Sequence, residues 1–239
     1  MKTLKPLGRK SYGHIPHFIG SRMTPADKHC EPGHQRIMAE KTRDRHDLII
    51  VQEKLDGSNC AVAKIDGEIV ALGRAGYLAI TSPYLQHRKF DEWVELNRHR
   101  FIDLLDNGER VVGEWMIQAC GTRYNLPHEP FVVFDIMIDS VRLNYHDFLL
   151  RVLPLGFVIP RLIHIGQSFR LKDAMDQIQI SGHGAIDPVE GVVYRCERKG
   201  KVDFLGKYVR PEKTDGYYLP GIGENTTEIW NQYEIPNNS

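Results

Sequence analysis

The chain has 239 residues, enough to bury a sizeable hydrophobic core in one large domain or two small ones, and we expect one. Lysine plus arginine equals aspartate plus glutamate, 31 against 31, so no global field attracts the protein to nucleic acid or to an anionic membrane. The absence of a signal-peptide core, of about 18 consecutive apolar residues and of any CxxC pair among the four cysteines predicts a soluble, reduced, cytoplasmic protein with no membrane partner.

The N-terminal part of the chain differs from the rest in composition and in periodicity. Residues 1–46 are rich in glycine, proline, histidine and charge with little periodicity, so we expect an irregular arm packed on a domain formed by residues 47–239. From Asp47 onward, short runs rich in β-branched residues predict strands over residues 47–55, 59–65 and 68–74. Asp66 and Gly67, between the last two runs, form a strong hairpin signal.

A longer segment with helical spacing follows. Ser82 as N-cap and Pro83 as first helical residue open a predicted helix that reaches about Leu105. The remaining predicted elements are strands over 110–118 and 131–138, a helix over 146–153, a strand over 158–165, a helix over 171–180, and strands over 190–197 and 201–210. We expect the polar tail to pack as a loop. The pattern predicts an α+β fold of antiparallel sheets flanked by helices.

The stretch VQEKLDGSNC places Lys54 between two acids, at the end of an apolar strand and before Gly57. A lysine with its ordinary pKa near 10.4 is a poor nucleophile, so covalent chemistry requires burial, nearby cations or a bound metal. A lysine that faces a pocket from a sheet meets the first condition, and Gly57 would let a phosphate approach the backbone closely. The alternative is a surface lysine paired with Glu53 or Asp56.

Further segments in order along the chain favour covalent chemistry, because together they resemble the covalent nucleotidyltransferases: ATP-dependent DNA ligases, RNA ligases and mRNA capping enzymes. The matching segments are EKLDG (53–57) for motif I, GRAGY (73–77) for motif Ia, GEWM (113–116) for motif III, FVVFDIM (131–137) for motif IIIa, EGVVYR (190–195) for motif IV and DFLGKYVR (203–210) for motif V. The resemblance implies the nucleotidyltransferase (adenylyltransferase) domain of these ligases.

Two residues make the resemblance closest to the bacteriophage RNA ligase 2 family. Asn59 stands five residues beyond the lysine, where DNA ligases and capping enzymes usually have arginine, and Arg74 lies where that family places an arginine. The chain departs from the family at Asp56, where RNA ligase 2 has histidine. It also departs in motif V, where the family has two lysines one residue apart. Here Val209 stands two residues after Lys207, at the position of the second lysine, and Arg210 comes next.

The resemblance implies a three-step reaction. Lys54 attacks the α-phosphorus of ATP and becomes covalently linked to AMP, the AMP moves to the 5′-phosphate of an RNA strand, and a 3′-hydroxyl displaces it. Lys207, Arg74 and Arg210 would supply cations around the reacting phosphorus, and Glu190 would hold Mg²⁺ or Mn²⁺. Without the resemblance, Glu190 would be interpreted as an exposed residue before a strand.

The nucleotide site follows from the same resemblance. Glu114 would accept hydrogen bonds from the ribose hydroxyls, Phe134 would stack on adenine, and Glu53 would contact the adenine amino group. Asp56 and Arg210 complete the expected nucleotide-binding set, while Asn59 and Arg74 would serve RNA contact and the later steps. For Phe134 the alternative is an ordinary core phenylalanine, because alternation already places one face of its strand in the core.

Three alternatives remain open on the sequence. One is a DNA nick-sealing ligase with the same chemistry, another is a non-catalytic RNA- or nucleotide-binding module of the same fold, and the third is a ligase limited to the final steps that needs preadenylated RNA. DNA ligases and capping enzymes usually append an OB-fold domain after motif V. Only about 29 residues follow Arg210, so we expect no OB-fold domain here.

Overall fold

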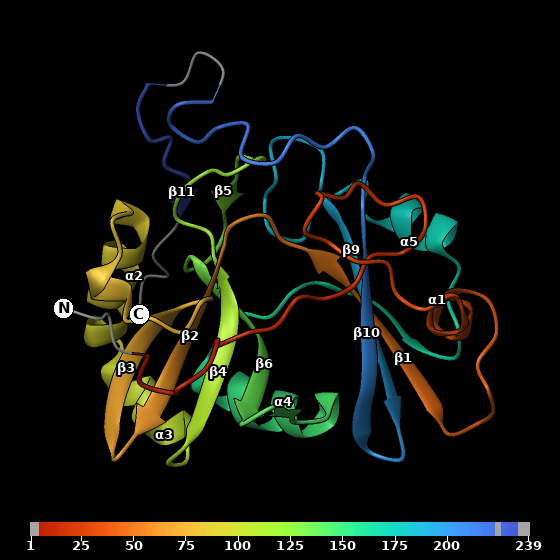
Figure 1. Ribbon diagram of the computed structural model, residues 1–239, viewed down its shortest axis with the longest axis horizontal. Coiled ribbons are helices and arrows are strands. Elements are labelled where there is room, and N and C mark those ends of the chain that lie inside the picture. Colours follow the sequence, from red (N-terminus) through yellow and green to blue (C-terminus); the bar gives the residue numbers. More distant parts are fainter. Residues whose placement is uncertain (1–4, 223–225, 234–239) are drawn as a thin grey trace. The chain divides into compact units, whose positions relative to one another are not determined.

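The computed structural model describes residues 5–222 and 226–233, and the chain forms two compact units (Figure 1). Unit 1 contains Met1–Gly13, Gly57–Gln118 and Glu129–Ile159, and unit 2 contains His14–Asp56, Ala119–His128 and Pro160–Ser239. The first residues of the expected arm (1–4) and parts of the expected tail loop (223–225 and 234–239) lie outside the described residues. Among the residues that are described, no helix has the length and apolar character needed to cross a membrane.

Unit 1 is built on an antiparallel sheet with the strand order β3-β2-β4-β6-β7. Its strands are β2 (Ser58–Ile65), β3 (Glu68–Gly73), β4 (Glu109–Trp115), β6 (Phe131–Ile138) and β7 (Val141–Arg142). The predicted hairpin between β2 and β3 is confirmed: Asp66 and Gly67 have φ of 51° and 84°, the left-handed values that a two-residue turn of this kind requires.

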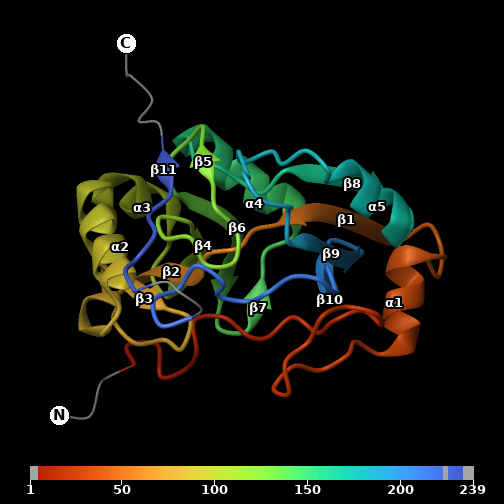
Figure 2. The same ribbon diagram turned by 90° about the horizontal axis from the view of Figure 1, so that it is seen from above.

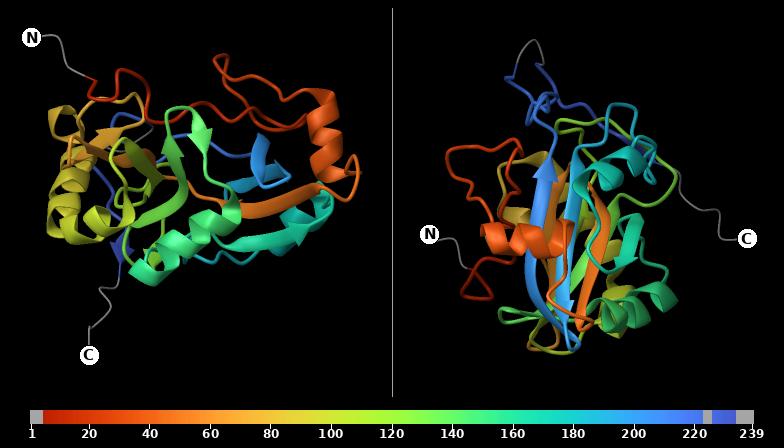
Figure 3. Two further views of the ribbon diagram at one scale, coloured as in Figure 1. Left: turned by 90° about the horizontal axis from the view of Figure 1, so that it is seen from below. Right: turned by 90° about the vertical axis from the view of Figure 1, so that its right-hand side faces the viewer.

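One face of this sheet is covered by helices (Figures 2 and 3). The helical elements of unit 1 are η1 (Ala79–Thr81), α2 (Leu85–Leu96), α3 (Arg98–Leu104), α4 (Tyr145–Val152) and η2 (Leu153–Leu155). Aromatic rings from α2 and α3 pack against rings from β4 and β6, including Phe90, Trp93, Phe101, Trp115 and Phe131. Since side chains alternate along a strand, the other face is left for Asn59 and Glu114.

Our expectation that a helix starts at Ser82 and reaches Leu105 is wrong at its start. The helix begins at Leu85, and Ser82 does not cap it. Instead, Ser82 Oγ accepts the Tyr84 N–H at 3.2 Å and pairs with His87 Nδ1 at 2.7 Å. These contacts hold Ser82 in a turn ahead of the helix.

The same segment also breaks in the middle, so it forms two helices rather than one. The break is at Asn97, whose backbone is not helical (φ −107°, ψ 14°). The Asn97 side chain donates to Trp93 O at 2.9 Å, so a local side-chain hydrogen bond competes with continuation of the helix.

Unit 2 is built on a second antiparallel sheet with the order β10-β9-β1-β8. Its strands are β1 (Asp47–Lys54), β8 (Leu162–Gly166), β9 (Gly191–Arg198) and β10 (Lys201–Val209). All four were predicted, although β8 starts later than expected. A short parallel pair, β5 (Asn125–Leu126) with β11 (Gln232–Tyr233), was not predicted and gives the tail a strand where we expected only a loop.

Two helices, α1 (Pro32–Ala39) and α5 (Leu171–Gln177), pack on one face of this sheet (Figures 1 and 2). The core there includes Met38 of α1, Ala174 of α5 and Val51 of β1. Helix α1 lies in the segment that we expected to be irregular, so that expectation is wrong for residues 32–39. Its start is favoured by Pro32, which occupies the first turn, where its missing N–H costs nothing.

The start of β1 is held by two arginines. The Asp47 carboxylate accepts hydrogen bonds from Arg43 (2.8 Å) and Arg198 (2.7 Å), and its side chain is fully buried. Burial opposes ionisation of this carboxyl, but the hydrogen bonds from Arg43 and Arg198 outweigh burial and hold the pKa of Asp47 below its ordinary value.

We therefore expect Asp47→Asn to lower the free energy of unfolding at neutral pH by about 1–3 kcal/mol, because both guanidinium groups lose a charged acceptor. The contribution of a carboxyl with a lowered pKa is present above its ordinary pKa and is lost as the pH falls through the folded-state value. Urea unfolding at a series of pH values measures both effects, with Asp103→Asn, an exposed aspartate of α3, as the matched control. Equal stability of Asp47→Asn and wild type at neutral pH would contradict the assignment.

Candidate active site

Lys54 and Glu190 form an ion pair at one end of the unit 2 sheet. Lys54 is the last residue of β1 and pairs with Gly191 of β9, so Glu190 directly precedes the partner of Lys54. Lys54 Nζ donates to Glu190 Oε2 at 2.6 Å and to Leu55 O at 3.3 Å. The two side chains are 19 % and 8 % exposed. The alternative of a surface lysine paired with a neighbouring acid is therefore wrong, because the acid that holds Lys54 precedes β9.

The charge state of Glu190 depends on this pairing. Burial raises the pKa of the Glu190 carboxyl above its ordinary value, although the neighbouring Lys54 acts in the opposite direction. A carboxylate in contact with an amine favours the ammonium form, whereas attack on phosphorus requires the neutral amine. The pair thus combines a nucleophile precursor with a group able to accept its proton, within hydrogen-bond distance.

Gly191 allows β10 to approach this end of the sheet. A Cβ at Gly191 would lie 1.9 Å from Tyr208 O, so no side chain fits there without moving β10. Arg210, directly after β10, donates its backbone N–H to Glu190 O at 3.0 Å. The predicted residues Lys54, Glu190 and Arg210 therefore come together at the same strand ends.

Lys207 lies on the same face of the sheet as Lys54. Val193 of β9 is the partner of both Gln52 of β1 and Lys207 of β10, so these three residues share a face. Side chains two residues apart on a strand point the same way, which adds Lys54 to that face. The sheet therefore presents two lysines of the expected site on one face, on strands that lie on either side of β9.

Glu53 points to the opposite face of the sheet. Its carboxylate accepts hydrogen bonds from Ser181 Oγ (2.6 Å) and from Gly182 N (2.8 Å), and burial raises its pKa. The loop before β9 thus already supplies two donors to the residue expected to contact adenine.

His17, from the arm, lies on the face of the two lysines and was not predicted from the sequence. The arm runs beside β10, with hydrogen bonds from Phe18 N to Lys207 O (2.8 Å) and from Lys207 N to Pro16 O (2.9 Å). This register places His17 beside Lys207.

The environment of His17 keeps its ring neutral near pH 7. The ring contacts Ser21 Oγ at 2.8 Å and lies 3.3 Å from Asp27. Burial, followed by the charge of Lys207, lowers the pKa of His17 to about 4. His17 therefore adds no positive charge to the face of the two lysines.

Asp56 is also held by a residue that was not predicted. Lys213 Nζ lies 2.9 Å from Asp56 Oδ2 and contacts Gly121 O and Thr122 Oγ1, while Gly121 N donates to the same carboxylate at 2.9 Å. The Lys213 side chain is 8 % exposed and that of Asp56 is 13 % exposed. The sequence around Lys213 does not indicate this contact, because only the tertiary fold brings Lys213 to motif I.

We expect Lys213→Met to lower the free energy of unfolding by about 3 kcal/mol, because it leaves the mostly buried Asp56 carboxylate without its cation. The double variant Asp56→Asn/Lys213→Met should recover part of this loss, since neither partner is then charged. Chemical denaturation of the wild type, both single variants and the double variant completes the cycle. Strictly additive single effects would show that the two side chains are not coupled.

In unit 1, Asn59 and Glu114 are directly opposed on β2 and β4. Glu114 Oε1 accepts the Gly57 N–H at 3.1 Å, and the buried Asn59 Oδ1 has no hydrogen-bond partner among the described residues. A Cβ at Gly57 would lie 2.6 Å from Trp115 O. Close packing against β4 therefore requires glycine at position 57, and our expectation that Gly57 lets a phosphate approach the backbone stays a prediction.

The other two predicted residues of unit 1 differ in exposure. Phe134 lies near an irregularity of β6, is half-buried, and meets the ring of Tyr12 edge-on with centroids 5.3 Å apart. It is therefore neither a fully buried core residue nor a freely exposed one. Arg74, one residue past β3, is exposed and donates to Gly13 O at 3.2 Å.

The described residues fit a metal bound mainly by water and substrate. Among residues 5–222 and 226–233, no group of three or more His, Cys, Asp or Glu side chains is arranged to hold a metal ion. Mg²⁺ usually keeps several waters and uses one or two protein carboxylates, so a single carboxylate such as Glu190 suits it.

Comparisons with known proteins point to one family. The family model described as RNA ligase matches residues 47–209. No curated protein sequence matches the chain. Among solved structures, an archaeal ATP-dependent RNA ligase is 20 % identical with a TM-score of 0.53, and the match covers 83 % of this chain and 48 % of that one. A variant RNA ligase of Naegleria gruberi, solved with ATP and Mn, is 17 % identical with a TM-score of 0.51, covering 81 % and 59 %.

A structure from Aquifex aeolicus, provisionally described as an ATP-dependent DNA ligase, is 16 % identical with a TM-score of 0.50, covering 83 % and 49 %. The chain thus spans about half the length of the structures that it matches, and at these identities the likeness shows the fold: the nucleotidyltransferase type, with mixed α and β structure and antiparallel sheets. Since the family model covers residues 47–209, well over half of the chain, the chain belongs to the RNA ligase family.

Proposed function

We propose that the protein is an ATP-dependent RNA ligase in which Lys54 is the nucleophile. The observation that carries this proposal is the Lys54–Glu190 pair, which lies at the ends of β1 and β9 inside the region matched by the family model. In the first step Lys54 Nζ forms a bond to the α-phosphorus of ATP, the bond to pyrophosphate breaks, and the amine loses a proton. Glu190, in contact with Nζ, receives that proton.

The next two steps transfer and release AMP. The 5′-phosphate of an RNA strand displaces Lys54 from the adenylyl phosphorus, and the 3′-hydroxyl of a second strand then attacks the activated 5′-phosphate, so AMP leaves. Each step concentrates negative charge at phosphorus, which cations stabilise. Lys207 serves this role on the same face of the sheet as Lys54, with Arg210 at the same strand ends as Lys54 and Arg74 and Asn59 acting on RNA in the later steps.

The roles in binding the sugar and the base rest on the family motifs together with the observed surroundings. Glu114 accepts hydrogen bonds from the ribose, and its contact with Gly57 N fixes the carboxylate for that purpose. Phe134 stacks on adenine through the part of its ring that Tyr12 leaves uncovered.

Two acids that flank the nucleophile complete the nucleotide site. Glu53 recognises the adenine amino group, and its contacts with the loop before β9 hold the carboxylate in place. Asp56, fixed by Lys213, orders the loop after Lys54.

A divalent cation, Mg²⁺ or Mn²⁺, would be held by Glu190 and would offset charge on the triphosphate and on the leaving pyrophosphate. We also propose a cytoplasmic location, because the cysteines, Cys30, Cys60, Cys120 and Cys196, are all buried free thiols.

The substrate end distinguishes an RNA ligase from a DNA nick-sealing ligase, which the Aquifex aeolicus match keeps as the second candidate. The test is a sealing assay with ATP and Mg²⁺ on substrates that differ only in ribose or deoxyribose at the 3′-terminal nucleotide. The proposal predicts sealing of the ribose-ended strand at a rate at least about tenfold higher, since a site that binds a hydroxyl rejects a substrate lacking it. Faster sealing of the deoxyribose end would favour the DNA ligase.

A further inference from the structure

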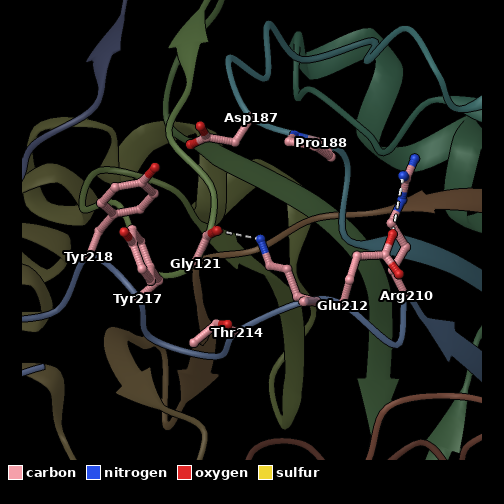
Figure 4. A pocket seen from close by; sticks show the side chains of 9 residues that line it. Gly121, Asp187, Pro188, Arg210, Glu212, Thr214, Tyr217 and Tyr218 are labelled. Atoms are coloured by element: carbon pink, nitrogen blue, oxygen red, sulfur yellow. Dashed lines mark hydrogen bonds and ion pairs between the residues drawn. The ribbon is translucent and has the colours of Figure 1, made fainter. Parts of the chain in front are cut away.

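Unit 2 contains a partly open cavity of about 220 Å³ beside the end of β10. Its walls include Asp187, Arg210, Lys213, Thr214, Tyr217 and Tyr218 (Figure 4). The two tyrosines lie on one side of the cavity and Arg210 on the other. The volume is below the roughly 300–1,000 Å³ of pockets that enclose drug-sized ligands, so this partly open cavity suits a ligand no larger than a single nucleotide.

Most of the charged side chains in these walls already form ion pairs. Asp187 is held by Arg123, with contacts of 2.8 and 3.0 Å, and Lys213 is held by Asp56. These pairs balance one another, so they leave no net charge to attract a ligand.

Arg210 has a weaker ion pair than the other charged side chains of the cavity. Its guanidinium lies 3.6 Å from the carboxylate of Glu212, a side chain that is 69 % exposed, and its buried Nε has no hydrogen-bond partner among the described residues. A long pair with an exposed acid is easily exchanged, so the Arg210 guanidinium is available to an incoming anion.

The tyrosines offer an aromatic surface. The rings of Tyr217 and Tyr218 meet edge-on with centroids 4.9 Å apart, and Arg123 lies over the Tyr218 ring at 5.0 Å. Tyr217 is 54 % exposed, so one ring is fixed and the other is accessible. An accessible ring beside a cation is the arrangement on which single-stranded nucleic acid stacks a base and places a phosphate.

The cavity is connected to the candidate active site within unit 2. Arg210 donates its backbone N–H to Glu190 O, and Lys213 binds Asp56, two residues after Lys54. We propose that this cavity binds the 5′-terminal nucleotide of the RNA substrate, with its base against Tyr217 and its phosphate at Arg210. This inference rests on the proposed ligase function, and it adds a substrate subsite formed largely by residues beyond motif V.

The probe for this subsite is a short 5′-phosphorylated RNA with 2-aminopurine as its first base, because stacking quenches 2-aminopurine fluorescence. We expect wild type to quench the probe and Tyr217→Ala to bind it about five- to a hundredfold more weakly, the loss that follows from removing one stacked base. Tyr217→Phe keeps the ring and should bind like wild type. Tyr84→Ala removes another exposed tyrosine, in unit 1, and serves as the matched control.

Two results would overturn the subsite: equal quenching by wild type and Tyr217→Ala, or quenching only when 2-aminopurine stands at the 3′ end. Labelling of each protein with α-labelled ATP is measured in parallel. If wild type takes up label but Tyr217→Ala binds RNA normally, the subsite is wrong and the ligase proposal stands. If wild type takes up no label, the ligase proposal itself fails.

Discussion

With alanine at position 54, the protein no longer seals 5′-phosphorylated RNA in the presence of ATP, a loss of at least about a thousandfold, because no other group replaces a covalent nucleophile. The same variant still seals RNA that already carries AMP on its 5′-phosphate, since Lys54 forms a bond only in the first step. Lys54→Arg should behave like Lys54→Ala, because a guanidinium keeps the charge but is not nucleophilic. Gel-based sealing assays with the two RNA substrates measure the difference.

Lys201→Ala is the matched control, since Lys201 is an exposed lysine at the start of β10. Two results would contradict the role given to Lys54. Sealing of 5′-phosphorylated RNA by Lys54→Ala at the wild-type rate would mean that another residue accepts AMP. Failure of the folded variant on adenylylated RNA, where wild type succeeds, would mean that Lys54 is needed beyond the first step.

Replacement of Glu190 by glutamine should slow labelling of the protein with ATP by about a hundred- to a thousandfold. The loss is expected because the substitution removes a charged group that contacts the nucleophile and that is also the proposed metal ligand. Glutamine keeps the size of the side chain and its ability to accept a hydrogen bond from Lys54, so the change tests the charge.

The pH dependence of labelling gives a second readout. Burial raises the pKa of Glu190, so its carboxylate forms only at a pH above the ordinary range for glutamate. We expect the wild-type labelling rate to rise with pH through that raised pKa, and this part of the rise to be lost in Glu190→Gln, which keeps only the rise that comes from deprotonation of Lys54. Glu197→Gln, which also breaks a buried ion pair on β9, is the control for lost stability. A wild-type rate and pH profile in Glu190→Gln would contradict the role of the carboxylate.

The strands were predictable because their signals are local. Runs of β-branched residues, alternation and the Asp66-Gly67 turn define β1, β2, β3, β6, β9 and β10 to within a residue or two. The helix over residues 82–105 was predicted as one element, because its break depends on the Asn97 side chain reaching Trp93 O. The pair of β5 and β11 joins two-residue segments far apart in the chain, and two residues carry no periodicity.

The candidate site also contains residues that the sequence predicted and contacts that it did not predict. The family motifs led to Lys54 and Glu190, but the ion pair between them is a contact across 136 residues that no spacing encodes. His17 and Lys213 had no motif to mark them. Each gains its place only from tertiary structure, His17 from the pairing of the arm with β10 and Lys213 from the chain's return to Asp56.

Incubation of the purified protein with α-labelled ATP and Mg²⁺, beside Lys54→Ala, tests the central claim most directly. Denaturing gels then show whether label is bound covalently, and treatment with acid and base shows whether the bond is a phosphoramidate. Acid-labile, base-stable label on wild type and none on Lys54→Ala is the predicted result. No label on wild type, with protein shown to be free of carried-over AMP, or equal label on both proteins, would contradict the assignment of Lys54 as the adenylylated nucleophile.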